Sequence, residues 1–515
     1  MTADPSARTT DEAPATTTDA TKAADVAHAT KGGFTQLLGA IAQMLMPVYH
    51  VTVARLFGQA TFGLYQYGLG VTDLAARLGW MGGDKAMHRF IAAHRADGED
   101  ELARRAFGGA LRLTASVSAI LAIALAFGAS LVARLSGKPG LAAMLPVLSF
   151  LVVPATATMV LVAATLGRKV TRVSFLVRSV GEPIFLLGAA FVAYALGGGA
   201  RALAAAHVSA STIGFVAAFV GACFVFGRSW VFSALRAPAH PKLVAFALPV
   251  AGSELGNAVL QKADFLVLGL FAPDKAVAIY VAAEFLGRIA ANVRYAFDGI
   301  AAPMLSEALH LGDRERLRGN LAMLTRWVAT LSVPLAVTMV GLRADLLSLY
   351  GQAYVAGASL VCVWTLTHLV NGTLGLVGHV LMMSGRSRTY FVNQAVAATL
   401  NVVLSLLLIP RFGMMGAAAS ALVAVTTPLV LMIVEVWVLE RVHPFAVGLV
   451  KPFVAGAAML AVELAVDGAV ASRFLRIASV IGAGLFVYLI ALALLRPGRE
   501  ERELVARVWA RLRRA

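Results

Sequence analysis

Two apolar segments of this 515-residue sequence each carry an acidic residue followed four residues later by a basic one. The pairs are Asp73 with Arg77 and Glu284 with Arg288. This spacing places both side chains on one face of a helix, and the acid-first order is the favourable one for an ion pair. Each pair therefore either neutralises itself and stabilises its own helix, or lines a hydrated space in which the base attracts an anionic ligand.

Further polar side chains recur at helical spacing in neighbouring apolar segments. Because polar groups are costly in hydrocarbon, such residues normally face the interior of a helix bundle or a water-filled cavity. We predict a central substrate cavity on this basis, with basic groups that suit an anionic cargo. The residues predicted to line it are Gln43, His50, Asp73, Arg77, Glu254, Asn257, Gln261, Lys262, Glu284, Arg288 and Tyr295.

The sequence lacks the common catalytic and metal-binding patterns. It contains no GxxxxGKS/T loop for nucleotide phosphates, no HExxH and no GxSxG. His368 and His379 share a helix face, but at 1.5 Å rise per residue they are roughly 16 Å apart, too far to share a metal ion. We therefore expect no enzyme activity, no catalytic residues, no metal and no cofactor, with coupling to H⁺ or Na⁺ left open.

The composition indicates that these polar residues belong to a membrane protein. Hydrophobic residues make up 59% of the chain and charged residues only 14%, whereas soluble domains have about a quarter charged. The mean hydropathy is +0.78, and many apolar runs exceed about 18 residues, the length that spans hydrocarbon as a helix. The net charge of +16 does not indicate a nucleic-acid partner, because most basic residues lie in short loops between the apolar runs.

We predict an all-α polytopic membrane protein of about fourteen transmembrane helices. Most of the 44 Lys and Arg residues fall in alternate loops. By the positive-inside rule, this places both termini in the cytoplasm of a multi-pass protein in the inner, cytoplasmic cell membrane. The predicted spans are residues 33–54, 62–82, 108–133, 141–166, 176–196, 203–226, 243–270, 277–301, 322–342, 358–383, 389–409, 414–439, 452–470 and 476–495.

An internal repeat divides the chain into two halves. Gly98–Arg104 recurs as Gly312–Arg318, and Leu56–Tyr65 recurs as Leu270–Tyr280 at almost the same spacing. An even number of helices separates the copies, which gives two parallel six-helix bundles around a central cavity. The predicted divisions are a disordered cytoplasmic tail (1–30), an N-terminal bundle (31–228), a C-terminal bundle (229–440), an extra transmembrane hairpin (441–495) and a basic cytoplasmic tail (496–515).

Several stretches within residues 33–440 resemble Wzx-type polysaccharide exporters. These stretches are Ala54–Gly58, Phe62–Tyr65, Arg89–Ala92, Lys262–Asp264, Ile279–Tyr280 and Ile409–Ala418. The resemblance implies the multidrug/oligosaccharidyl-lipid/polysaccharide exporter fold, in which two six-helix bundles rock between inward- and outward-open states around a cavity lined by helices 1, 2, 7 and 8. It also implies a flippase that moves an undecaprenyl-diphosphate-linked oligosaccharide to the outer leaflet for the synthesis of a polysaccharide such as O-antigen. The implied partners are this lipid-linked glycan, membrane lipids, and the glycan polymerase and glycosyltransferases of the pathway.

Three alternatives remain open from the sequence. A cation-coupled multidrug antiporter has the same fold, and a membrane glycan polymerase or ligase handles the same lipid carrier. Glycan polymerases and ligases resemble chains with a large outward loop, which this sequence lacks. The third alternative is a non-transporting scaffold of a glycan assembly complex. The C-terminal helix pair resembles that of the lipid II flippases, although Glu463 and Asp467 would be unfavourable in a groove that faces lipid.

Overall fold

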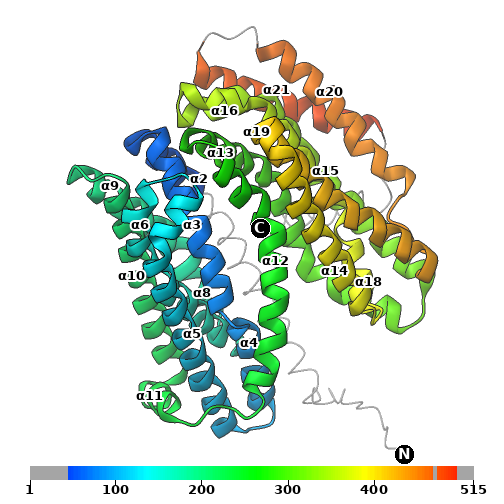
Figure 1. The fold of residues 1–515 in the computed structure, drawn as a ribbon. Coiled ribbons are helices and arrows are strands. Elements are labelled where there is room, and N and C mark those ends of the chain that lie inside the picture. The colour runs from blue at the N-terminus through cyan, green and yellow to red at the C-terminus, as the bar shows by residue number, and fades with distance from the viewer. Residues whose placement is uncertain (1–44, 468–471, 496–515) are drawn as a thin grey trace, which may run out of the picture.

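The structure, a computed structural model, describes residues 45–467 and 472–495 (Figure 1). Within these residues, eleven helices are long and apolar enough to cross a membrane. The prediction of an all-α polytopic membrane protein is therefore confirmed. The predicted tails 1–30 and 496–515 and the first residues of the predicted span 33–54 lie outside the described residues, and the predicted domain boundaries stay predictions.

Helices of the first half of the chain continue to residue 236. They are α2 (Leu45–Phe57), α3 (Gln59–Gly79), α4 (Gly83–Ala96), α5 (Asp100–Leu135), α6 (Gly140–Ser149), α7 (Val152–Gly167), α8 (Arg172–Ser174), the π-helix η1 (Phe175–Gly181), α9 (Glu182–Ala195), α10 (Ala200–Phe226) and α11 (Arg228–Arg236).

The second half begins at residue 243 and ends with a separate helix pair. Its helices are α12 (Leu243–Phe271), α13 (Asp274–Arg288), η2 (Ile289–Ala291), α14 (Asn292–His310), α15 (Arg314–Gly341), α16 (Arg343–Tyr350), η3 (Gln352–Gly357), α17 (Ala358–Leu374), α18 (Val377–Met383) and α19 (Ser387–Glu440). The last pair comprises η4 (Val447–Leu449), α20 (Val450–Asp467) and α21 (Arg473–Leu494).

The described helices agree with the predicted number of about fourteen spans. Helix α19 holds two of them, because Gly413 leaves helical geometry at φ 55° and ψ −132°, a left-handed φ that glycine adopts without a Cβ penalty. Helix α3 covers most of the second predicted span, and α2 covers the described end of the first, which brings the described helices close to this number.

The internal repeat is visible as two matching turns. Gly98 has φ 72° and Gly312 has φ 66°, and each glycine stands two residues before a long membrane helix, α5 or α15. In each turn the residue after the glycine donates its N–H to a carbonyl five residues earlier; the pairs are Glu99 to His94 (2.8 Å) and Asp313 to Ala308 (3.1 Å). The predicted spans leave out residues 83–107 and 302–321, and the structure fills these segments largely with helix: α4 and the start of α5 in the first, the end of α14 and the start of α15 in the second.

Contacts between loops sort them into two ends of the molecule. At one end, the outer end, Lys138 of the α5–α6 turn forms an ion pair of 2.7 Å with Asp274, and Arg55 donates to carbonyl groups at the end of α16. At the opposite, inner end, His94 and His240 lie 3.2 Å apart. These ends bring together the loops that the sequence places outside and inside, respectively, whereas the compartment that each end faces stays a prediction.

The hydrophobic core joins the halves at the outer end and divides towards the inner end. One cluster of buried residues combines side chains of both halves, among them Tyr49 and Tyr280. Of two further clusters, one lies around Phe107 of the first half and includes Leu243 at the start of α12, and the other lies around Leu321 of the second half. The two halves therefore share one core at the outer end, whereas at the inner end α12 is the helix of the second half that joins the core of the first, and it runs between the two groups of helices (Figure 1).

The C-terminal pair α20 and α21 packs against α15. Glu463 of α20 is 1% exposed and accepts a hydrogen bond of 3.2 Å from Thr338 Oγ1 of α15. Its carboxyl group lies beside the backbones of Gly341 and Gly484, where a Cβ atom would meet it. Glu463 thus faces protein, and its charge does not oppose contact between lipid and the outward surface of the pair.

Candidate functional site

Several predicted cavity residues of the second half lie together on α12 and α13. Glu284 and Arg288 form an ion pair within α13, and the Arg288 side chain is 44% exposed against 15% for Glu284. Lys262 and His368 lie close enough to Glu284 to act on its charge. Since a guanidinium carries five N–H donors, the pairing with Glu284 leaves donors of Arg288 available to a ligand, with a second cation nearby.

His50 of α2 brings the first half to the same place. His50 is 8% exposed, and its ring packs edge-on against Phe285 of α13 with 4.3 Å between the ring centroids. No described residue forms a hydrogen bond with its Nδ1. The charges of Arg288 and Lys262 also act on the His50 ring. The polar residues of α12 and α13 therefore continue across the junction onto α2 of the first half.

The corresponding pair of the first half has a different exposure. Arg77 Nε lies 3.0 Å from Asp73 Oδ2, and the side chains are 18% and 39% exposed. The Arg77 guanidinium also lies 5.8 Å from the ring centroid of Trp80. The acid is therefore the more accessible member of this pair, whereas the base is the more accessible member of the Glu284–Arg288 pair.

The remaining predicted residues of α12 lie nearer the inner end. Glu254 forms an ion pair with Lys85 of α4 and so links the halves. Further along the same face, Gln261 Nε2 donates to Asn257 Oδ1 at 3.0 Å. Because exposed amides and charges are unfavourable in hydrocarbon, this face of α12 indicates a hydrated space.

Two predicted residues do not join these groups. Tyr295 is 57% exposed in α14 and lies beside Arg294, whose guanidinium is 5.2 Å from its ring centroid. Gln43 lies outside the described residues. The structure thus shows where the predicted residues lie, and their role in substrate binding stays a prediction.

A buried carboxyl group outside the predicted set lies between α12, α13 and α19. Asp264 is 3% exposed and accepts hydrogen bonds from the Tyr280 hydroxyl and from Asn401 Nδ2, the latter at 3.3 Å. Ser405 Oγ donates to Asn401 Oδ1 at 3.3 Å and lies 3.0 Å from Ser420 Oγ. The sequence places these polar residues on the polar faces of separate helices. No sequence pattern indicates that these faces meet at Asp264.

Known proteins share both sequence features and the fold of this chain. The sequence profile of the polysaccharide biosynthesis protein family matches residues 29–309, more than half of the chain. No curated protein sequence matches this chain. Among solved structures, it is similar to the lipid II flippase MurJ in an inward closed conformation, with a TM-score of 0.66, 14% identity, and coverage of 91% of this chain and 100% of that one.

Two multidrug transporters of the MATE family have similar structures as well. An inward-facing member of the MOP superfamily gives a TM-score of 0.62 at 14% identity, covering 78% of this chain and 99% of that one. A eukaryotic member gives 0.58 at 13% identity, covering 83% and 98%. The expected exporter fold is therefore confirmed, and this multi-pass membrane protein belongs to the polysaccharide biosynthesis protein family.

Proposed function

We propose that the protein is a flippase that moves an undecaprenyl-diphosphate-linked oligosaccharide from the cytoplasmic to the outer leaflet by alternating access. Family membership supports a role in polysaccharide biosynthesis, and the fold shared with a lipid II flippase and with drug transporters supports transport. The observation that carries the proposal is the accessible guanidinium of Arg288, with Lys262 nearby. A planar, permanently charged donor fork suits a diphosphate.

The space beside Arg288 is proposed to hold water and, in turn, the polar part of the cargo. An ionised side chain in hydrocarbon costs on the order of 3 kcal/mol or more. The accessible charges of α13 are therefore better explained by a hydrated cavity than by contact with lipid. Because the hydrophobic core divides towards the inner end, the described state suits entry of the cargo from that side.

The proposal assigns transport rather than catalysis to the chain. The protein is proposed to lie in the cell membrane with both termini in the cytoplasm. The inner end then faces the cytoplasmic leaflet, on which lipid-linked glycans are assembled. The glycosyltransferases and the glycan polymerase of the pathway are then the proposed partners, and lipid tails of the cargo remain in the bilayer beside the helices.

Deletion of the gene is expected to block a surface or secreted polysaccharide while complete lipid-linked repeat units accumulate in the cell. The reason is that flipping follows assembly of the precursor and precedes its polymerisation. The measurement is the pool of lipid-linked oligosaccharide in the deletion strain, with the complemented strain as control. Absence of complete repeat units would assign an earlier enzymatic step, and normal polysaccharide with raised drug sensitivity would favour the antiporter.

We also propose that the buried group around Asp264 couples transport to a cation, either H⁺ or Na⁺. The buried Asp264 carboxyl group accepts hydrogen bonds from the neutral side chains of Tyr280 and Asn401, and its charge is costly there unless it binds a proton or a metal cation. Hydroxyl, amide and carboxylate oxygens are the ligands that hard cations prefer. Its contacts reach α13 and α19, so that binding there acts on the packing of three helices.

Asp264→Asn is expected to reduce gradient-driven transport about tenfold or more, because the isosteric amide keeps the packing but cannot take up a proton and lacks the negative charge that attracts Na⁺. The measurement is transport by reconstituted protein with imposed H⁺ and Na⁺ gradients. Glu463→Gln makes the same chemical change at another buried acid, in α20, and should preserve the gradient dependence. Unchanged gradient dependence of Asp264→Asn would remove this residue from the coupling mechanism.

A further inference from the structure

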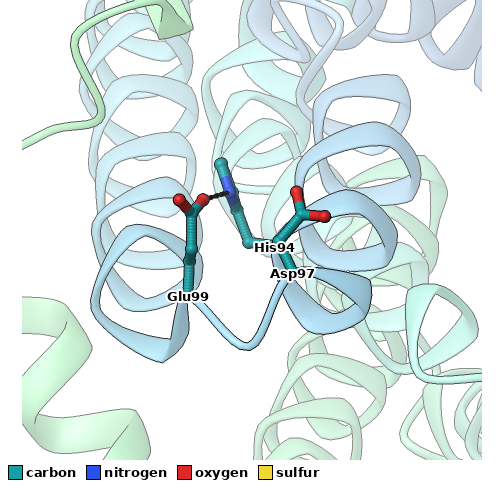
Figure 2. Close-up of side chains that lie close together, drawn as sticks. All are labelled: His94, Asp97 and Glu99. Carbon is teal, nitrogen blue, oxygen red and sulfur yellow. Dashed lines mark hydrogen bonds and ion pairs between the residues drawn. The ribbon is translucent and has the colours of Figure 1, made fainter.

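A chain of hydrogen bonds at the inner end ties the linker between the halves to the first half. The linker covers residues 237–242, between α11 and α12, and contains His240. His240 is 6% exposed, and its Nε2 lies 3.2 Å from Nε2 of His94, at the end of α4. His94 Nδ1 in turn lies 2.7 Å from a carboxylate oxygen of Glu99, as Figure 2 shows.

The hydrogen bond between Lys242 and His240 determines which atoms donate along this series of hydrogen bonds. The backbone N–H of Lys242 donates to His240 Nδ1 at 3.2 Å. Nδ1 of His240 is therefore an acceptor, and the neutral ring carries its proton on Nε2. His240 Nε2–H then donates to His94 Nε2, and His94 Nδ1–H donates to Glu99. Every member of the chain is satisfied only while both imidazoles are neutral.

A proton on either imidazole breaks one hydrogen bond of this arrangement. If His94 is protonated, its Nε2–H faces the Nε2–H of His240 at 3.2 Å, and two donors cannot form a hydrogen bond. If His240 is protonated, its Nε2–H still donates to His94, but its Nδ1–H faces the N–H of Lys242, and that bond is lost. In both cases the linker is held by one hydrogen bond fewer.

Charged groups surround the pair on every packed element. The bases are Arg89 of α4, which stacks on Phe246, Arg105 of α5, which donates to a linker carbonyl, and Lys242; the acids are Glu99 and Asp97 of the α4–α5 turn (Figure 2). A cavity of about 140 Å³ next to His94 is also lined by Arg95, Asp100 and Arg168, and gives protons access to the pair.

Burial lowers the pKa of His240, and the charges of His94, Arg105 and Lys242 lower it further, against the opposite effect of Glu99. The docked linker therefore binds a proton less readily than a released linker, whose histidine has the ordinary value of about 6.5. By linkage, docking has its full stability above this value and loses stability as the pH falls below it.

The linker also positions α12. At its start, α12 packs on the first half, where Leu243 contacts the position of Gly109 and Val250 contacts that of Gly82. We propose that His94 and His240 form a pH-sensitive latch, which holds the linker and the inner end of α12 against the first half at neutral pH and releases them in acid. This inference does not depend on the identity of the cargo.

The test is amide hydrogen exchange of the full-length protein in lipid nanodiscs at pH 7.5 and 5.5, with rates corrected for the intrinsic effect of pH. In the unmodified protein, the amides of residues 237–246 should be about fivefold less protected at pH 5.5, as expected for the loss of about one net hydrogen bond. His240→Phe keeps the ring contacts with Phe90 but cannot donate. This variant should show the low protection at both pH values.

His94→Phe removes the other side of the same bond and should give the same result, which provides a second variant if one folds poorly. His88→Gln is the matched control, because His88 is an exposed histidine of the same helix α4; it should keep the pH dependence of the unmodified protein. Equal protection of the linker at both pH values in the unmodified protein would overturn the latch. Retention of the pH dependence in both phenylalanine variants would also overturn it.

Discussion

Arg288→Gln is expected to leave the protein folded in the membrane and to reduce transport of the lipid-linked diphosphate roughly 10- to 100-fold, the loss expected for one charged hydrogen-bonding group. The Arg288 side chain is 44% exposed, and its guanidinium pairs with Glu284, which leaves other donors for the proposed hydrated space. Lys262 remains near Glu284 in the variant and limits the cost to folding. The measurement is flipping by reconstituted protein at matched protein levels.

Arg77→Gln provides the informative comparison. Because Arg77 is only 18% exposed and packs over Trp80, we expect this change to lower expression more than it lowers transport per folded molecule. The swapped pair Glu284→Arg with Arg288→Glu restores the charge pairing but moves the cation by one helical turn, so it should restore stability and not transport. Full transport by Arg288→Gln, or by the swapped pair, would remove the proposed anion site.

Asp274→Asn is expected to open the outer end of the protein. The Lys138 side chain is 3% exposed and has Asp274 Oδ1 at 2.7 Å and the Ala272 carbonyl at 2.9 Å. Removing the acid leaves a buried cation without its counter-charge, which costs about 3 kcal/mol or more. At about 1.4 kcal/mol per factor of ten, the equilibrium should shift roughly 100-fold towards the outward-open state. Lys138→Met should have a smaller effect, since Asp274 is 29% exposed and can be solvated.

The measurement for the outer end is the distance distribution between spin labels at Leu196 and Gln352, with Cys223 and Cys362 replaced by Ser. Leu196 and Gln352 are both exposed and lie in different halves at the outer end. Arg134→Met is the matched control, because it removes an exposed cation from the end of α5, four residues before Lys138. A closed distribution in Asp274→Asn that matches the control would contradict the proposed role of the ion pair.

The sequence predicts the membrane helices well because hydrophobic runs are a local signal. It gives no span for α4 and ends the eighth span within α14, because these segments mix apolar and charged residues. The turn glycines Gly98 and Gly312 are an exception, because the repeated motif marks both of them before the structure shows their shared left-handed geometry.

The site is less predictable from the sequence than the fold. Pairs within one helix, such as Glu284 with Arg288, follow from four-residue spacing. Partners on different helices do not, and Asp264 with Asn401, Lys138 with Asp274 and His94 with His240 are known only from the packing of the helices. The unequal exposure of Arg77 and Arg288 is likewise a tertiary property, which the similar sequence patterns of the two pairs conceal.

The central claim is that this chain moves a lipid-linked oligosaccharide across a bilayer, and reconstitution tests it most directly. Purified protein in liposomes is supplied with undecaprenyl-diphosphate-linked oligosaccharide in the inner leaflet, and the glycan is probed from outside with an impermeant reagent. We predict that labelled glycan appears in the outer leaflet faster with the protein than in empty liposomes, and that Arg288→Gln removes most of this increase. Equal labelling with and without folded protein would contradict the account.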